Sequence, residues 1–165
     1  MPTTERIQQL IHAYADGPRR LEGAVAGLSE EELNFKPGPE HWSILENVVH
    51  LADTDLVAAT RLRYVLAQPG ATLVSFDQNA WATTLQYSSQ SAPDALALFR
   101  AVRGSTAELL RRAPVEAWGY AGVNTQSGLQ TVEWIVEHFA EHVQGHVKTI
   151  AKRRQQHAEA VGGRR

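Results

Sequence analysis

Apolar residues recur at every third or fourth position in four long stretches of the chain, and this helical period constrains the fold most strongly. The stretches begin at about Glu5, at Ser43, after Ser91 and at about Thr131. None of them shows the alternation of a half-buried strand. We therefore predict an all-α protein, most simply a four-helix bundle. Its long crossover loops near 69–91 and 114–130 should cross the bundle ends or carry small extra helices.

Local signals predict where these helices begin, break and end. Ser43 and Glu46 form a Ser-x-x-Glu capping box at the start of the second helix, and Gln68-Pro69-Gly70 should end it. Gly17-Pro18 should kink or divide the first helix, because proline lacks an amide donor and clashes with the preceding turn. The fourth helix is expected to continue to about Gln156.

The chain has 165 residues, of which 43% are hydrophobic, enough for one compact core. It contains no internal repeat and no linker that would separate domains. We predict a single domain over residues 1–156 and a flexible basic tail over 157–165. The basic stretch over 152–165 could be interpreted as a nucleic-acid arm, but cations at a helix C-terminus are the simpler explanation.

Charge and hydropathy exclude several classes of partner. Lys and Arg number 16 and Asp and Glu number 18, a net charge of −2, whereas nucleic-acid binders carry a basic excess. No apolar stretch approaches the roughly 18 residues of a membrane span. The N-terminal residues lack the pattern of a signal peptide, so we expect a cytoplasmic protein with no nucleic-acid or membrane partner.

Cysteine is absent from the chain. Disulfides, thiolate metal sites, iron–sulfur clusters and a cysteine nucleophile are therefore excluded. Any sulfur chemistry would need a thiol supplied from outside the protein.

Histidine is the unusual residue: the chain has seven, and three lie within 137–147. His142 and His146 stand one helical turn apart, a spacing that lets two imidazoles reach one metal ion. The apolar stripe of this helix includes His146, has His142 on its flank and leaves His138 outside. The alternative is a pair of exposed or hydrogen-bonded core histidines.

A metal site needs a third ligand from another helix, and the sequence offers four candidates. They are His12, His41, His50 and Asp53. Periodicity does not choose among them. The residue after His142 is Val143, so the Glu that serves as general base in His-Glu-x-x-His metalloproteases is missing and the catalytic residues stay unknown.

Several short motifs follow one another in an order that resembles the DinB/YfiT-like superfamily. They are Trp42-Ser43-Ile44, Val48-Val49-His50-Leu51-Ala52-Asp53, Arg61-Leu62-Arg63, Phe76-Asp77-Gln78-Asn79-Ala80-Trp81-Ala82 and the closing His142-x-x-x-His146. The similarity extends from the first helix to about Ile150.

The resemblance implies an up-down-down-up bundle, often a homodimer, that holds a divalent metal through His50, His142 and His146. Imidazole ligands suit zinc, nickel or iron. Asp53 would then orient a ligand imidazole or a bound water, unless it is a solvated helix carboxylate. Trp81 would wall the metal pocket or belong to the core.

Three imidazoles would leave coordination positions open, which is typical of a catalytic site. The resemblance implies a metal-dependent hydrolase that acts on a small-molecule substrate through metal-bound water. The first alternative is a thiol S-transferase that uses an external low-molecular-weight thiol. A non-catalytic, metal-stabilised binding module is the second alternative.

Overall fold

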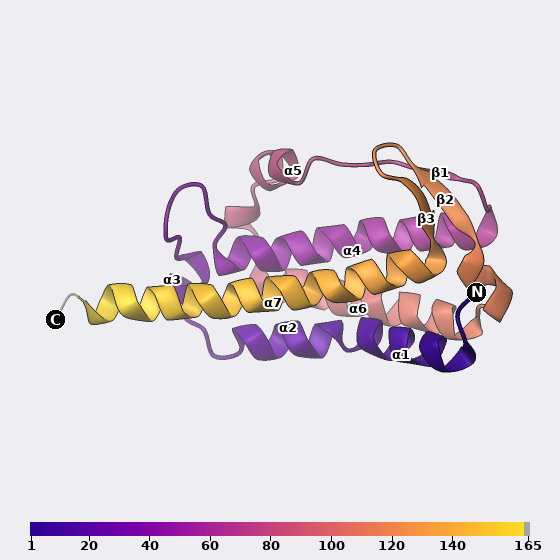
Figure 1. The fold of residues 1–165 in the computed structure, drawn as a ribbon. Coiled ribbons are helices and arrows are strands. Elements are labelled where there is room, and N and C mark those ends of the chain that lie inside the picture. The colour runs from indigo at the N-terminus through magenta and orange to yellow at the C-terminus, as the bar shows by residue number, and fades with distance from the viewer. Residues whose placement is uncertain (164–165) are drawn as a thin grey trace.

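Four helical rods lie side by side in the computed structural model, which describes residues 1–163 (Figure 1). The rods are α1 (Thr4–Ala15) continued by α2 (Gly17–Val25), then α4 (Ile44–Ala67), α6 (Ala92–Arg112) and α7 (Val132–Gly162). α4 and α6 run in one direction, and α1–α2 and α7 run in the other. The predicted up-down-down-up bundle is confirmed.

The capping box that the sequence predicted at the start of the second long helix is present in the structure. The amide of Glu46 donates to Ser43 Oγ at 3.2 Å, and the amide of Ser43 donates to Glu46 Oε2 at 2.8 Å. The first rod divides at Asp16, and Pro18 lies in the first turn of α2, where its missing amide donor costs nothing. α3 (Glu30–Asn34) is a short helix before α4.

A long crossover joins α4 to α6, because parallel neighbours cannot be linked by a tight turn. It carries β1 (Thr72–Leu73), α5 (Gln78–Thr84) and the 3-10 turn η1 (Tyr87–Ser89), and it returns along the outside of α4 (Figure 1). The small extra helices predicted for this connection are present. The second long connection contains the 3-10 turn η2 (Val115–Gly119).

A small sheet, which the all-α prediction omitted, closes one end of the bundle. β2 (Ala121–Asn124) pairs antiparallel with β3 (Gly128–Thr131) and parallel with β1. Strands of two and four residues are too short to show an alternating pattern in the sequence. Gly122 permits the close approach, since a Cβ there would lie 2.8 Å from the Leu73 side chain.

The core contains a buried ion pair between Arg103 of α6 and Asp55 of α4. Arg103 Nε donates to Asp55 Oδ1 at 2.9 Å, and the two side chains are 1% and 0% exposed. Arg103 also donates to the carbonyl oxygens of Tyr14 at 3.0 Å and Phe139 at 3.2 Å. Residues of all four rods therefore contact the Arg103 guanidinium. Phe139, which accepts one of these hydrogen bonds, lies about one turn before His142 on α7.

The C-terminal part of α7 corrects the predicted tail. The helix continues past Gln156 to Gly162, because residues 157–161 contain no glycine or proline that would end it. The His157 ring packs edge-on against Phe35, with ring centroids 5.2 Å apart. Residues 157–162 are thus helical, and Arg164 and Arg165 of the predicted tail lie outside the described residues.

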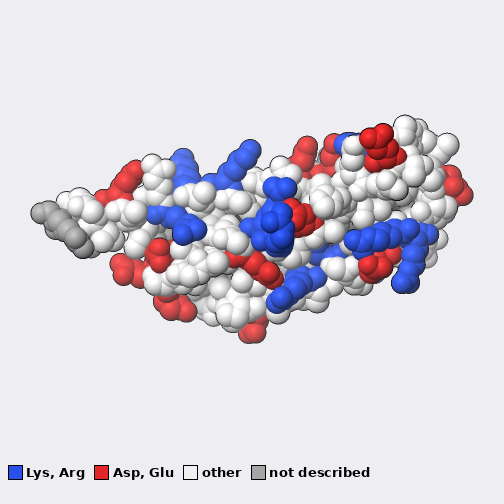
Figure 2. Space-filling model, turned by 90° about the horizontal axis from the view of Figure 1, so that it is seen from below, with Lys and Arg blue, Asp and Glu red and all other residues white. Residues whose placement is uncertain are grey.

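The surface is mixed in charge. On the face seen in Figure 2, basic and acidic side chains are interspersed. Local ion pairs contribute to this mixture: Asp16 pairs with both Arg19 and Arg20, at 2.6 and 2.7 Å. Within residues 1–163, no helix combines the length and the apolar character needed to cross a membrane.

Candidate metal centre

Three histidines from two antiparallel helices meet in the described part of the chain. His50 lies on α4, and His142 and His146 lie one turn apart on α7. His142 Nε2 is 3.3 Å from His50 Nε2 and 3.1 Å from His146 Nε2. One ligand nitrogen from each residue therefore lies within 4.8 Å of the other two.

These spacings fit a single transition-metal ion. Two imidazole nitrogens bound to one zinc ion at about 2.05 Å are separated by about 2.9 Å at a right angle and about 3.4 Å at a tetrahedral angle. The nitrogen separations of 3.1 and 3.3 Å fall inside that interval. The donor set suits zinc, nickel or iron, as the sequence indicated.

The hydrogen bonds around the cluster leave the Nε2 lone pair of His146 directed at the other histidines. Asn47 Nδ2 donates to the Ser43 carbonyl at 2.7 Å, so its Oδ1 accepts from His146 Nδ1, also at 2.7 Å. The proton of His146 is then on Nδ1, and its Nε2 lone pair faces His142. Among residues 1–163, His50 Nδ1 is buried without a hydrogen-bond partner.

All three imidazoles are neutral at pH 7, which is the form that binds metals. Burial lowers the pKa of His50 to about 3, with a smaller contribution from His146. Burial and the neighbouring histidines lower the pKa of His142 to about 3, and burial lowers that of His146 to about 4.

The cluster is buried on the side of His50 and open to a pocket on the side of His146. His50 is only 1% exposed, and the Trp42 ring covers it with a centroid distance of 4.7 Å. His146 and Asn47 line a pocket of about 300 Å³ together with Asn79 of α5. A substrate or water molecule can therefore approach from the side of His146.

Asp53 does not orient any of the ligands in this structure. It lines a hollow between α4 and α6 with Ser91 and Asp94, and no hydrogen bond joins it to the three imidazoles within the described residues. Asn47, one turn before His50 rather than one turn after it, holds His146. Sequence reasoning missed Asn47, although its place in the first turn of α4 beside the Ser43 cap was a usable signal.

The remaining histidines are placed elsewhere. His138 stacks on Trp134 with centroids 4.6 Å apart, His41 pairs with Glu40 at 3.0 Å, and His12 belongs to α1. Burial, and to a lesser degree the charge of Arg61, lowers the pKa of His138. Of the four candidates for the third ligand, His50 is the one that the structure brings within 4.8 Å of both His142 and His146.

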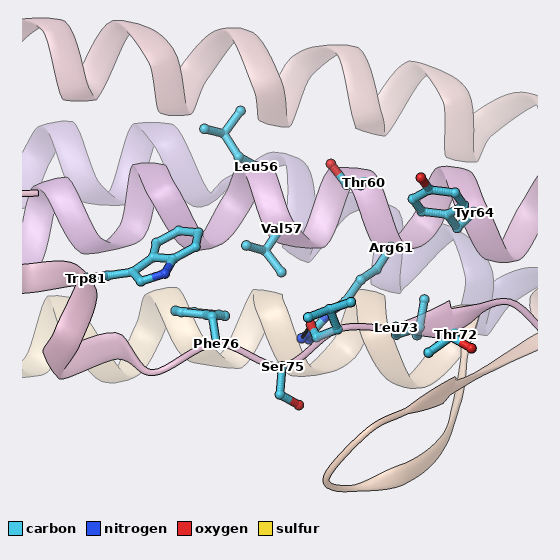
Figure 3. Close-up of a pocket in the computed structure, with 11 residues that line it drawn as sticks. Leu56, Val57, Thr60, Arg61, Tyr64, Thr72, Leu73, Ser75, Phe76 and Trp81 are labelled. Atoms are coloured by element: carbon cyan, nitrogen blue, oxygen red, sulfur yellow. Dashed lines mark hydrogen bonds between the residues drawn. The ribbon is translucent and has the colours of Figure 1, made fainter. Parts of the chain in front are cut away.

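A second cavity, of about 420 Å³, lies between α4 and the crossover. We call it the α4 groove; Val57, Thr60 and Arg61 contribute from α4, and Phe76 and Trp81 from the crossover. In Figure 3, Phe76 and Trp81 extend toward α4 beside Val57. Trp81 therefore walls this groove and not the pocket beside His146, and it also packs against the core, which was the second alternative predicted for it.

Comparisons with known proteins agree with the fold and the cluster. A Geobacillus thermodenitrificans protein named "Putative metal-dependent hydrolase" is 30% identical over 64% of this chain and 60% of its own length. "Putative metal-dependent hydrolase YfiT" of Bacillus subtilis is 23% identical over 65% of this chain and 60% of its own length. The chain thus spans about three-fifths of these relatives.

A solved structure of Bacillus subtilis YfiT, described as "a probable metal-dependent hydrolase with an unusual four-helix bundle topology", superposes with a TM-score of 0.89. It covers 96% of this chain and 91% of YfiT at 19% identity, a likeness of fold. The family model described as "DinB superfamily" matches residues 13–150, which include all three clustered histidines. The chain therefore belongs to the DinB superfamily.

Proposed function

We propose that this protein is a metal-dependent hydrolase whose divalent ion is held by His50, His142 and His146. The observation that carries the proposal is the convergence of three Nε2 atoms at separations of 3.1 and 3.3 Å. The names of the relatives in the same superfamily support it.

The chain's own residues prepare the ligands. Burial keeps the imidazoles unprotonated, so the ion does not have to displace protons at neutral pH. Asn47 fixes the tautomer and ring orientation of His146. Trp42 excludes water from the His50 side and leaves the His146 side for the substrate.

A divalent ion bound by three protein ligands supplies Lewis acidity and lowers the pKa of a water molecule at an open position. Hydrolysis needs both effects. Val143 occupies the position of the metalloprotease general base, so the proton acceptor must come from another part of the protein or from the substrate.

Metal content is the first test of this proposal. The full chain is treated with a chelator, reconstituted separately with zinc, nickel and ferrous iron, desalted, and assayed for metal per chain. We expect about one ion per chain, lost in H50A, H142A and H146A. H138A is the matched control, since His138 lies on the same helix outside the cluster and should leave the metal content unchanged.

Activity is tested on the reconstituted protein with nitrophenyl esters, phosphate esters and anilides. Turnover that disappears with chelator and in H142A supports hydrolysis. The same protein is assayed with glutathione, mycothiol and bacillithiol and an electrophilic halide. Metal-dependent thiol consumption without hydrolysis would contradict the hydrolase and favour the thiol S-transferase, for which the cysteine-free chain would need an external thiol.

A further inference from the structure

We propose that the α4 groove binds the substrate and that Arg61 recognises a carboxylate at the substrate's far end. The inference rests on the proposed function, because it names the substrate class of that metal centre: a small carboxylate with an apolar body. Three observations support it: the contacts of Arg61, the residues that line the groove, and the position of the groove on the same face of α4 as His50.

Among the described residues that line the groove, Arg61 alone is charged, and a single hydrogen bond to a carbonyl engages its guanidinium within residues 1–163. Arg61 Nη2 donates to the Val74 carbonyl at 2.8 Å. Its Nε is buried without an acceptor, and no carboxylate among residues 1–163 forms a salt bridge with it. A guanidinium has five N–H donors in a planar fork, which matches the two oxygens of a carboxylate.

Arg63, two residues further along α4, differs from Arg61 because protein groups accept hydrogen bonds from both of its terminal nitrogens. Its Nη1 donates to the Ala59 carbonyl at 3.0 Å and to Thr106 Oγ1 at 3.2 Å, and its Nη2 donates to Ser105 Oγ at 3.2 Å. Arg63 thus ties α4 to α6, whereas Arg61 faces a cavity.

The rest of the groove suits an apolar body. Val57, Phe76 and Trp81 form its wall nearest α5, and the Phe76 and Trp81 rings lie 4.5 Å apart (Figure 3). A volume of about 420 Å³ is sufficient for a small aromatic or branched aliphatic molecule. Burial lowers the pKa of Arg61, and an anion seated beside it would offset that desolvation.

The groove and the metal centre share one face of α4. His50, Val57 and Arg61 are separated by seven and four residues, so their side chains lie along one line of the helix. Eleven residues of α-helix span about 16 Å, so His50 and Arg61 lie about three turns apart on this face of α4. A substrate anchored at Arg61 would extend along this face of α4 toward the candidate ligands.

The test uses 4-phenylbutyrate and its neutral amide, 4-phenylbutyramide, as probes of the full chain. Binding is followed by amide chemical shifts in the metal-free and the reconstituted protein. We expect the carboxylate to bind at least about tenfold more tightly than the amide in both forms, with shifts in the backbone around residues 57–61 and 73–81.

R61Q should abolish the preference for the carboxylate, and R61K should retain part of it because it keeps the charge without the fork. R63Q is the matched control: it removes a neighbouring charge from the same helix and should leave the preference intact. Thermal melting of each variant verifies the fold. Phenylbutyl phosphate forms a third arm, and a stronger preference for it would overturn the carboxylate assignment.

Equal binding of acid and amide, or an unchanged preference in R61Q, would overturn the inference. A preference that appears only in the reconstituted protein and survives in R61Q would place the carboxylate on the metal and overturn it as well. The proposed hydrolase function and the role of Arg61 can each be refuted without the other. Probe binding without metal binding would refute the hydrolase alone, and metal binding without probe binding would refute the role of Arg61 alone.

Discussion

Asn47 Oδ1 accepts a hydrogen bond from His146 Nδ1 at 2.7 Å, so the amide of one helix fixes the tautomer of a candidate ligand on another. The Asn47 amide is itself held by the Ser43 carbonyl at 2.7 Å. The start of α4 therefore orients the side chain that faces the open pocket.

Replacing Asn47 should weaken metal binding without unfolding the protein. We expect Asn47→Leu to reduce metal affinity about 10- to 100-fold, because the His146 ring loses the acceptor that orients it. Competition with a chromogenic chelator measures the change. Asp53→Asn is the control and should bind metal as the wild type does; equal losses in both variants would contradict the role of Asn47.

The metal-free protein should lose stability as the pH falls below about 6.5. The three histidines have pKa values of about 3, 3 and 4 in the fold, below the ordinary value of 6.5. The unfolded chain therefore binds more protons in that range, so their contribution is fully present above pH 6.5 and decreases toward pH 3.

Between pH 6.5 and 5 the loss should be on the order of 1–2 kcal/mol for the buried His50, and smaller for His142 and His146, which are partly exposed. Urea unfolding at pH 7 and pH 5 measures it. The double variant H142A/H146A should show a shallower dependence, and an identical slope in both proteins would refute this explanation.

Breaking the buried ion pair should be severely destabilising. Arg103→Met leaves the Asp55 carboxylate buried without its cation and should cost about 3–5 kcal/mol of unfolding free energy. The double variant R103M/D55L should recover much of that loss, because no unpaired charge remains. Arg19→Gln, which removes an exposed pair with Asp16, should cause no comparable loss in the same urea titration.

Two glycines should respond in opposite ways to alanine. In Gly122→Ala the new Cβ would meet the Leu73 side chain at 2.8 Å and the Ala71 carbonyl oxygen at 2.9 Å, so we expect a loss of about 1–3 kcal/mol. Gly23 lies within α2 with open space around it, and Gly23→Ala should gain about 0.5–1 kcal/mol. Thermal melts measure both effects. An unchanged melting temperature in Gly122→Ala would show that the sheet accommodates the new Cβ without cost and would contradict the prediction.

The helices could be predicted because their signals are local. The capping box of Ser43 and Glu46 and the proline after Gly17 act within a few residues, and the structure reproduces both. The sheet depends on pairing between Leu73 and Asn124, about fifty residues apart, which no local pattern encodes. The length of α7 exceeded the prediction because charged residues near its end were interpreted as fraying.

The metal centre was only partly predictable for a similar reason. The apolar stripe of α7 correctly predicted that His142 and His146 face inward, since that helix has one buried face. α4 is buried over its whole circumference from Ile44 to Ala52, so no stripe could say where His50 points. The resemblance to the superfamily indicated His50 as the third candidate ligand, and the structure places it within reach of His142 and His146.

The parallel course of α4 and α6 has a consequence for how such proteins diversify. It obliges the chain to return along the outside of the bundle, and that returning segment forms a wall of the α4 groove and carries Asn79 to the pocket beside His146. The candidate ligands sit on rods fixed by the core, whereas part of the groove wall belongs to a connection that is largely exposed and is anchored in the core at Leu73 and Tyr87. Substrate preference can therefore drift through mutations in the crossover while stability and metal affinity stay under separate selection.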